Sequence, residues 1–448
     1  MMFTWKELRK ITGGQWNGGS LPEDVPGVSG VTDNSRDVKS GDLFVAIPGG
    51  IADGHDHIPS AVQSGAVVFC VERRRKDAKF NGTPRLLVDD TLEAFHELAR
   101  AHRRRFADLD MIAITGSTGK TSVRCMISSI LEQQCSGHVL STLGNTNNHF
   151  GVPRNLLALE ERHRYAVLEI GSNHPGEIAQ LTRLAQPRIG LITNIGRAHL
   201  EYFGDLLGVA MEKGSLFAGL KGKDAVAVMP DDCAHVDILR SIAARHRIVT
   251  FGKSDEADVR FEYGGRCNDE YCVRLFWAGA ADEGVEVKWP IGGEHQARNA
   301  AAACAVAFSL GIDADTIVAG LQNVQLPRMR MEVVTRNEVG WVNDAYNANP
   351  ESMRGSVEWF LELTDDYPDA DTYLVLGDML ELGDHEVEEH ESLLRWVLER
   401  FPAHSILPTG PRMVRASEAM GIQGFENADA VRDELLPRLR PGDWVLLK

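Results

Sequence analysis

Short, continuous apolar runs recur along most of the chain and alternate with polar, glycine-containing turns. Runs of this kind are typical of strands that are buried on both faces of a parallel sheet. Polar segments with helical spacing lie between many of them, which predicts an α/β fold. The runs that predict strands lie at residues 43–47, 66–70 and 86–88, at 111–115, 166–169, 189–193 and 225–228, and at 339–344, 372–376, 405–408 and 444–447.

The remaining patterns add helices and one antiparallel segment. Residues 91–106, 123–132 and 295–310 are predicted as helices, and the last of these is rich in alanine and therefore expected to be buried. Residues 271–277 alternate between apolar and polar side chains, which favours antiparallel strands between about 255 and 292. The chain is thus predicted to combine parallel sheets with an antiparallel extension.

The length of the chain and the two places where its strand–helix series restarts predict three domains. A chain of 448 residues corresponds to about three domains of ordinary size. The alternation of strands and helices starts anew at residue 111, and again after a linker that contains proline and arginine, Leu326–Arg330. We therefore predict an N-terminal α/β domain at 1–107, a central α/β domain at 108–325 and a C-terminal doubly wound, Rossmann-like domain at 326–448.

The charge and the cysteine content narrow the class of protein. A net charge of −17 argues against a general nucleic-acid binder, so an anionic ligand must be held by local cations and helix N-termini. Seven cysteines without a C-x-x-C pair are typical of free thiols in a reducing compartment. The first residues lack the apolar core of a signal peptide, and the longest apolar run, 300–308, is too short to span a bilayer. We therefore expect a cytoplasmic protein without membrane insertion.

The strongest chemical signal is a glycine-rich turn between the strand at 111–115 and the helix at 123–132. Its string, Gly116-Ser-Thr-Gly119-Lys120-Thr121, matches the shorter G-x-x-G-K-T form of a phosphate-binding loop. Backbone N–H groups and the helix N-terminus can hold phosphate oxygens, while the lysine reaches the outer phosphates and the threonine hydroxyl holds Mg²⁺. A plain glycine-rich turn is the alternative. The residues predicted to bind the nucleotide here are Gly116, Ser117, Thr118, Gly119, Lys120, Thr121 and Ser122.

Three polar clusters follow other predicted strands, where open α/β sheets bind ligands. Glu169 leaves the strand beside the glycine turn and could bind Mg²⁺, although a solvated acid or a helix cap would look the same. His199 in the second cluster, with Lys213 after it, is a candidate metal ligand or substrate contact, but a structural histidine is equally compatible. The third cluster, Asn343–Ser352, could line a cleft or simply start a helix.

Together these motifs resemble the Mur ligases, the ATP-dependent amide-forming enzymes of bacterial peptidoglycan precursor synthesis. Two strings, Asn145–Pro153 and Tyr346–Pro350, resemble the branch of the family that adds a D-alanyl-D-alanine dipeptide. The Asp-Asn-Pro-Arg string of the diaminopimelate-adding branch is absent. The resemblance extends over nearly the whole chain, through strings at 33–36, 41–46, 53–55, 115–122, 144–153, 192–201, 344–350 and 376–383.

The resemblance implies a three-domain Mur ligase with a central phosphate-loop ATPase domain and a C-terminal Rossmann-like domain. It implies a monomeric, cytoplasmic ligase that joins D-Ala-D-Ala to UDP-N-acetylmuramoyl-tripeptide through an acyl phosphate, with the last domain closing over the reactants. Two other enzymes remain open, a family member that adds a single amino acid and a folylpolyglutamate synthase. A binding protein that hydrolyses ATP as a switch is a further alternative.

The resemblance also implies roles for individual residues. Ser35 and Arg36 would lie in a uridine pocket, and Asn145, Asn147 and Asn148 would contact the substrate. Lys120 and Thr121 would hold ATP phosphates and one Mg²⁺, with Glu169 and His199 serving a second Mg²⁺ and Lys213 carrying a carbamate. The residues implied to contact the rest of the nucleotide are Asn299, Arg330, Asp344 and Asn347.

Two positions depart from the family pattern. Gln296 replaces an asparagine near the adenine contact Asn299, which removes one expected hydrogen bond. Met329 replaces the glycine expected before Arg330, where the chain links the last two domains. We expect this second change to affect the hinge.

Overall fold

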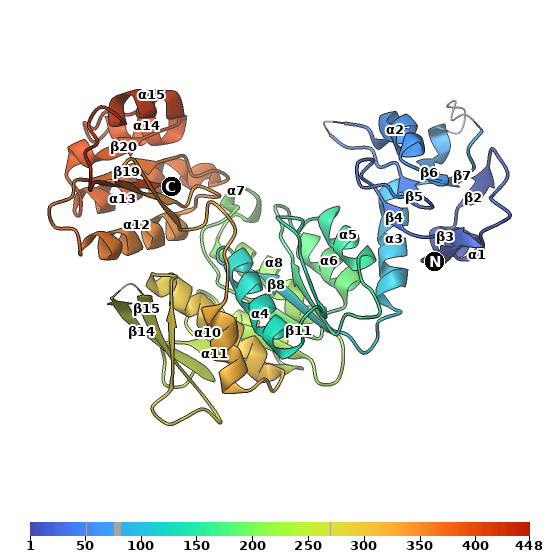
Figure 1. The fold of residues 1–448 in the computed structure, drawn as a ribbon, viewed down its shortest axis with the longest axis horizontal. Helices are drawn as coiled ribbons and strands as arrows, with labels where there is room; N and C mark the ends of the chain where they lie inside the picture. Colours follow the sequence, from blue (N-terminus) through green and yellow to red (C-terminus); the bar gives the residue numbers. More distant parts are fainter. Residues whose placement is uncertain (51, 76–81, 269) are drawn as a thin grey trace. The chain divides into compact units, whose positions relative to one another are not determined.

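The computed structural model describes residues 1–50, 52–75, 82–268 and 270–448 and shows a mixed α/β protein (Figure 1). The chain forms two compact units. The first unit contains residues 1–109 together with 142–164 and 183–185, and the second contains 110–141, 165–182 and 186–448. Two segments that follow the glycine turn in the sequence thus belong to the first unit. The domain boundaries predicted at 107/108 and 325/326 stay predictions.

The first unit is built on a five-stranded sheet with the order β2-β7-β6-β5-β4, which is parallel except for β2. A small core that includes Phe44, Phe69 and Leu87 fills one side of this sheet. Its strands are β1 (Phe3–Thr4), β2 (Gln15–Asn17), β3 (Gly27–Val28), β4 (Val31–Thr32), β5 (Leu43–Val45), β6 (Val68–Glu72) and β7 (Arg85–Val88). Its helices are α1 (Trp5–Thr12), α2 (Ile58–Gln63), α3 (Thr91–Arg103) and α5 (Gly151–Leu157).

Helix α3 holds the two inserted segments in the first unit. It packs against α5, and His96 and His102 each contact a backbone carbonyl of residues 142–164, at 2.7 and 2.9 Å. Arg103 donates to a carbonyl of residues 183–185 at 2.9 Å. Burial lowers the pKa of both histidines, so the neutral imidazoles suit these carbonyl contacts. The segment that carries the asparagine-rich string is therefore tied to the N-terminal unit.

The second unit contains a nine-stranded sheet with the order β16-β15-β14-β13-β12-β11-β8-β10-β9. Strands from β9 to β14 pair in parallel, and β14, β15 and β16 pair antiparallel, as predicted for the 271–277 region. The strands are β8 (Asp110–Thr115), β9 (Val139–Ser141), β10 (Tyr165–Glu169), β11 (Ile189–Ile192), β12 (Val226–Pro230), β13 (Arg247–Gly252), β14 (Val259–Cys267), β15 (Glu270–Trp277) and β16 (Val285–Trp289).

Helices cover this sheet, and α4 and α10 lie beside each other on it (Figure 1). Small alanine side chains let α10 approach α4 and strands β12 to β14, and residues 300–307 of α10 are buried. The prediction of a buried alanine-rich helix is thus confirmed. The helices are α4 (Lys120–Gln134), α6 (Glu177–Ala185), α7 (Leu200–Phe203), α8 (Leu206–Ala218), α9 (Val236–Ala243), α10 (Glu294–Ser309) and α11 (Ala314–Gln322).

The C-terminal part of the second unit has its own five-stranded sheet, with the order β17-β18-β21-β19-β20. Only the edge strand β17 pairs antiparallel, which gives the doubly wound arrangement that the sequence predicts. Its strands are β17 (Glu332–Arg336), β18 (Val339–Asn343), β19 (Thr372–Leu376), β20 (Ile406–Pro408) and β21 (Trp444–Leu447). Its helices are α12 (Pro350–Thr364), α13 (Glu386–Leu398), α14 (Pro411–Glu418) and α15 (Ala428–Leu435).

Two whole-chain properties can be read from the described residues. Within them, none of the helices is long and apolar enough to cross a membrane. The seven cysteines form no disulfide with one another.

Candidate functional site

The glycine turn connects β8 to α4 and has a conformation that only glycine adopts easily. Gly116 and Gly119 have φ angles of 151° and 77°. A Cβ atom on Gly116 would lie 1.8 Å from the Thr193 hydroxyl oxygen, and one on Gly119 would lie 2.5 Å from the Asn299 amide oxygen. Both glycines are therefore required by backbone conformation and by close packing. The turn also brings the predicted adenine contact Asn299 next to the predicted phosphate loop.

A second loop, at the end of β11, supports the turn through a network of hydrogen bonds. Asn194 accepts from the Thr118 backbone N–H at 2.9 Å and donates to the Thr118 hydroxyl at 2.7 Å. Ser117 accepts from the Gly196 N–H at 2.9 Å and donates to the Gly196 carbonyl at 3.0 Å. Thr193 donates to the Thr118 carbonyl at 2.5 Å. The polar groups of Ser117 and Thr118 thus hold the turn in shape.

Lys120 opens α4 and folds back over the turn. Its ammonium group donates to the Gly116 carbonyl at 2.7 Å. Desolvation lowers the pKa of Lys120 and the charge of Arg330 lowers it further, while Glu169 opposes this shift. An incoming anion would offset the burial of this charge. This environment fits the predicted role of Lys120 as a phosphate ligand, which stays a prediction.

Thr121 and Glu169 place a hydroxyl and a carboxylate side by side. The Thr121 hydroxyl donates to one Glu169 oxygen at 3.2 Å, and the buried Arg124 guanidinium donates to the other at 2.7 Å. Hydroxyl and carboxylate oxygens are ligands that Mg²⁺ accepts, with phosphate and water completing its shell. The donor set therefore fits the predicted metal. Within the described residues no cluster of three His, Cys, Asp or Glu side chains could hold an ion without such help.

Arg330 reaches this group from the linker between the two sheets. Its guanidinium donates to the Thr121 hydroxyl at 2.9 Å and lies 4.2 Å from the centre of the Tyr346 ring. Its neighbours Met329 and Met331 have φ angles of 62° and 52°, which are unfavourable for side chains other than glycine. The hinge effect expected from Met329 thus coincides with a left-handed backbone conformation at that residue.

Lys213 and His199 are two titratable groups close to Lys120, and both lose affinity for a proton there. Lys213 is 2% exposed, and its burial together with repulsion from Lys120 lowers its pKa to about 7. Burial, Lys213 and Lys120 lower the pKa of His199 to about 4, so this imidazole is neutral at neutral pH. These mutual repulsions show that His199 and Lys213 lie near Lys120, and the roles that the resemblance implies for them stay predictions. Glu212 instead caps α6, where it accepts from two backbone N–H groups at 2.7 and 2.8 Å.

The substituted Gln296 supports the nucleotide side of the site in a different way. It accepts a hydrogen bond from the Asn299 side chain at 3.0 Å and contacts the Met331 sulfur at 3.1 Å. The missing asparagine is thus replaced by a residue that orients Asn299 and touches the linker.

Asp344 and Asn347 lie after β18, and internal contacts occupy both side chains. Asp344 accepts from the Met331 N–H at 3.0 Å, from the Ser356 hydroxyl at 2.5 Å and from the Lys448 ammonium at 2.6 Å. Asn347 is exposed, and its side chain accepts from the next backbone N–H at 3.0 Å. Asp344 therefore connects the linker to the C-terminal sheet through hydrogen bonds. Its ribose or phosphate contact stays a prediction.

The other polar residues of this third cluster begin a helix. Asn349 caps α12 and forms a capping box with Ser352. The helix-start interpretation of this part of the cluster is thus confirmed.

The predicted substrate residues all lie in the first unit. Ser35 is half-buried and Arg36 exposed, in a turn that the Asn34 side chain stabilises. Asn145 and Asn148 are exposed and Asn147 is half-buried. Asn148 also caps α5, where it accepts from the backbone N–H groups of residues 150 and 151 at 3.1 and 3.0 Å.

An ion pair connects the two substrate segments. Arg154 on α5 binds both carboxylate oxygens of Asp33, at 2.6 and 2.8 Å, and the Asp33 side chain is 4% exposed. Paired hydrogen bonds of this kind fix orientation as well as distance. The turn with Ser35 and Arg36 is therefore held beside the asparagine-rich segment, which the sequence analysis did not foresee.

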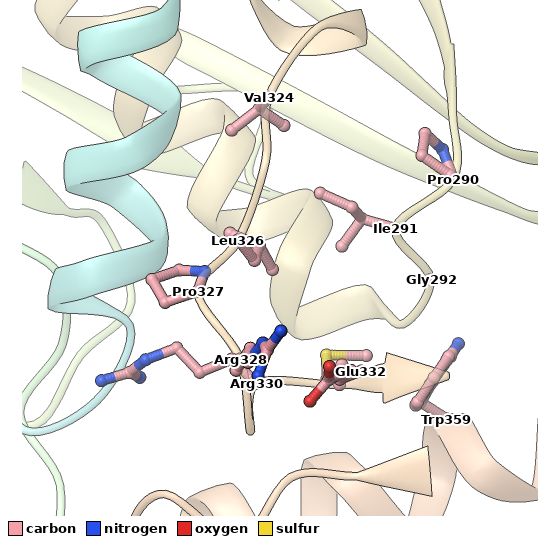
Figure 2. Close-up of a pocket in the computed structure, with 11 residues that line it drawn as sticks. Pro290, Ile291, Gly292, Val324, Leu326, Pro327, Arg328, Arg330, Glu332 and Trp359 are labelled. Carbon is pink, nitrogen blue, oxygen red and sulfur yellow. The ribbon is translucent and has the colours of Figure 1, made fainter. Parts of the chain in front are cut away.

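A cavity of about 220 Å³ lies beside the linker. Figure 2 shows the linker along one side of it, Pro290 and Ile291 on the other, and Trp359 from α12 below. Arg330 is the predicted site residue that lines it. The cavity thus belongs to the hinge, and Lys120, Glu169 and Lys213 do not line it.

Comparison with known proteins identifies the family. Models described as the Mur ligase family catalytic domain, the Mur ligase middle domain and the Mur ligase glutamate ligase domain match residues 27–103, 114–307 and 329–448. A UDP-N-acetylmuramoyl-tripeptide–D-alanyl-D-alanine ligase from Haemophilus influenzae is 33% identical over 413 residues, which cover 92% of this chain and 87% of the relative. The ligase of that name from Escherichia coli is 35% identical over 385 residues, with coverages of 85% and 80%.

The chain belongs to the Mur ligase family.

Solved structures agree with this assignment to the Mur ligases. MurF from Acinetobacter baumannii superimposes with a TM-score of 0.88 at 32% identity, covering 99% of this chain and 95% of that one. The MurF ligase from Thermotoga maritima in complex with ADP gives a TM-score of 0.80 at 27% identity, and 93% of each chain is covered. The predicted family, the α/β fold and the class of ATP-dependent ligase are therefore confirmed.

Some residues of this Mur ligase site were missed from the sequence. Arg124 lies one helical turn after Lys120, and its spacing could have suggested that it faces the same strand ends. Asp33 was part of a quoted string, but its partner Arg154 is remote in sequence. Asn194 supports the glycine turn and falls within the string at 192–201, but no role is predicted for it from the sequence.

Proposed function

We propose that this protein joins D-alanyl-D-alanine to UDP-N-acetylmuramoyl-tripeptide at the expense of ATP. The observation that carries the proposal is the phosphate loop, with Lys120 above it and the Thr121–Glu169 pair beside it. The names of the curated relatives supply the two substrates. The protein would work as a cytoplasmic monomer, as its resemblance to the Mur ligases implies.

In the proposed reaction ATP first activates the tripeptide. A terminal carboxylate oxygen attacks the γ-phosphorus, the bond to the β-bridging oxygen breaks, and ADP leaves. Lys120 stabilises negative charge on the moving phosphoryl group, because its ammonium is desolvated and close to the phosphate position. Two Mg²⁺ ions, held by Thr121, Glu169 and His199, would neutralise charge on the phosphate oxygens.

The second step forms the amide bond. The amine nitrogen of D-Ala-D-Ala attacks the carbonyl carbon of the acyl phosphate, phosphate leaves with the bonding electron pair, and the nitrogen loses its proton. Arg330 from the linker and Asn299 from α10 would hold the nucleotide, with Asp344 and Asn347 approaching from the C-terminal sheet. Ser35, Arg36 and the asparagines 145, 147 and 148 would hold the UDP-peptide, on the first unit.

Lys213 would carry a carbamate in this site. Its pKa of about 7 leaves a large fraction of neutral amine at neutral pH, and only the neutral amine reacts with CO₂. The amine nitrogen adds to the CO₂ carbon and loses a proton, which converts a disfavoured cation into an oxygen anion beside Lys120. Such an anion is a good Mg²⁺ ligand.

We expect ¹³C NMR to detect this carbamate. Protein equilibrated with ¹³CO₂ should show a carbamate resonance that is absent from Lys213→Ala and retained in Lys223→Ala, a variant of an exposed lysine. Turnover of Lys213→Ala should fall by about 10²-fold or more, because the site loses an anionic ligand. An unmodified Lys213 in the active enzyme would contradict the proposal.

The overall function is tested by phosphate release and by mass analysis of the product. A ligase should release phosphate only when ATP, UDP-N-acetylmuramoyl-tripeptide and D-Ala-D-Ala are all present, and the product should gain the mass of the dipeptide less water. Phosphate release without an amine acceptor would favour the nucleotide-switch alternative. Activity with a single amino acid instead of the dipeptide would favour another branch of the family.

A further inference from the structure

Three glutamates from separate elements of the C-terminal part contact one loop of the nine-stranded sheet. This loop, Thr193–Glu201, follows β11 and carries His199. Glu351 at the start of α12 accepts from the Arg197 backbone N–H at 3.0 Å. Glu389 on α13 forms an ion pair of 3.0 Å with the Arg197 guanidinium.

The third glutamate, Glu381, touches His199 directly. One of its carboxylate oxygens is in contact with Nδ1 of the neutral His199 imidazole, and its carbonyl accepts from the Glu201 N–H at 3.2 Å. Gly383 follows closely, and a Cβ there would lie 2.9 Å from the Glu201 Cα. The backbones of the two loops are therefore in close contact at this point.

The same loop is bonded to the phosphate turn on its other side. Asn194 and Gly196 hold Thr118 and Ser117 through the hydrogen bonds described above. Only two residues separate Gly196 from His199. A displacement of the loop would therefore move the support of the phosphate turn and the candidate metal ligand together.

The backbone conformations of His199 and Glu381 also depend on the contacts around them. His199 and Glu381 have φ angles of 57° and 62°, in the left-handed region that side chains other than glycine avoid. Residues persist there when surrounding contacts fix them. The Arg197–Glu389 pair is partly exposed, with Arg197 at 49%, so it adds little to the stability of the fold. We expect the Arg197–Glu389 pair to fix the position of the loop instead.

We propose that Glu351, Glu381 and Glu389 are positioning residues, which fix His199 and the support of the phosphate turn by anchoring the Thr193–Glu201 loop. The proposal rests on the proposed role of the phosphate turn in ATP binding. A carboxylate that contacts a candidate metal-binding histidine would orient its ring, as such pairs do in metal sites.

Amide hydrogen exchange tests the contact without any substrate. In the ligand-free protein, Glu351→Ala should increase exchange of the Arg197 amide by about tenfold or more, because the bonded carboxylate is gone. Glu388→Ala is the matched control, since Glu388 is an exposed neighbour of Glu389 on α13. Unchanged exchange in Glu351→Ala would overturn the proposal.

Steady-state kinetics test the positioning role. Glu389→Ala should lower kcat by about tenfold and leave the KM for D-Ala-D-Ala within about twofold, because the phosphate site is displaced and the acceptor site is not. Arg197→Ala should have the same effect, and the double variant should be no worse than either single one. Thermal unfolding of all three should match that of Glu388→Ala. Additive losses, or wild-type kcat in Glu389→Ala, would overturn the proposal.

One further variant separates this inference from the proposed function. If Lys120→Ala loses turnover while Glu389→Ala behaves like the wild type, only the positioning role fails. If Lys120→Ala keeps wild-type turnover, Lys120 has no part in the mechanism, and the proposed function loses the observation that carries it together with the positioning role.

Discussion

Replacing Lys120 with alanine should reduce turnover by about 10²–10³-fold or more, the usual cost of removing a donor that stabilises a transition state. The ammonium bonds the Gly116 carbonyl at 2.7 Å, at the mouth of the glycine turn. Few other cations could substitute for it, because Arg330 is engaged by Thr121 and Lys213 is buried. Single-turnover phosphate release measures this loss directly.

The same variant should change nucleotide binding much less than it changes turnover. Backbone N–H groups and the N-terminus of α4 remain in place, so binding of a fluorescent ATP analogue should weaken by about tenfold or less. Lys223→Ala, an exposed lysine, is the control for a change in charge alone. Near-normal turnover in Lys120→Ala would remove this residue from the mechanism.

Most buried strands and several amphipathic helices could be predicted from the sequence because their signals are local, although the buried strand β13 was missed. The helix predicted at 91–106 is α3 (Thr91–Arg103), and the strand predicted at 372–376 is β19. Edge strands were missed, such as β9 and β17, whose side chains are half-buried or exposed and form no apolar run. Their place in the sheet depends on pairing with distant strands.

The grouping of residues 142–164 with the first unit could not be predicted either. The order of elements along the chain places this segment between β9 and β10 of the nine-stranded sheet. Its assignment depends on contacts with α3, which include the carbonyls that His96 and His102 bind. Such side-chain to backbone contacts leave no periodic signal in the sequence.

Some residues of the candidate site could be predicted from the sequence, and others could not. The phosphate turn was visible because one short string determines its conformation, and Glu169 and His199 were visible because they follow buried strands. The glutamates that contact the His199 loop come from three separate elements and have no shared motif. Only the folded chain places these three elements beside the His199 loop.

The methionine at position 329, where the family pattern has glycine, affects the backbone of the linker. Met329 and Met331 flank Arg330 with left-handed backbones, and the Met331 N–H is bonded to Asp344. A glycine at 329 would adopt this conformation without strain, so the methionine makes this particular hinge geometry less favourable on its own. Contacts of Arg330 with Thr121 and Tyr346 offset that cost.

Glu169 has a structural contact with Arg124 and a predicted metal-binding role beside Thr121, and variants can test these two roles separately. One carboxylate oxygen bonds the Thr121 hydroxyl, where the predicted Mg²⁺ would bind, and the other accepts from the buried Arg124. Loss of one member of a buried ion pair costs roughly 3–5 kcal/mol of stability, because the remaining charge is left in a poorly solvated place. A loss of activity in a Glu169 variant could therefore reflect unfolding as much as loss of metal.

The pair of variants Glu169→Gln and Arg124→Met/Glu169→Gln should distinguish these roles. Glu169→Gln should lower the free energy of unfolding and raise the Mg²⁺ concentration for half-maximal activity by at least about tenfold. The double variant buries no unpaired guanidinium, so its stability in urea should recover, while its Mg²⁺ requirement should stay high because the anionic ligand is still missing. If the double variant also regains the wild-type Mg²⁺ requirement, Glu169 acts only through Arg124, and the metal must be held by other residues.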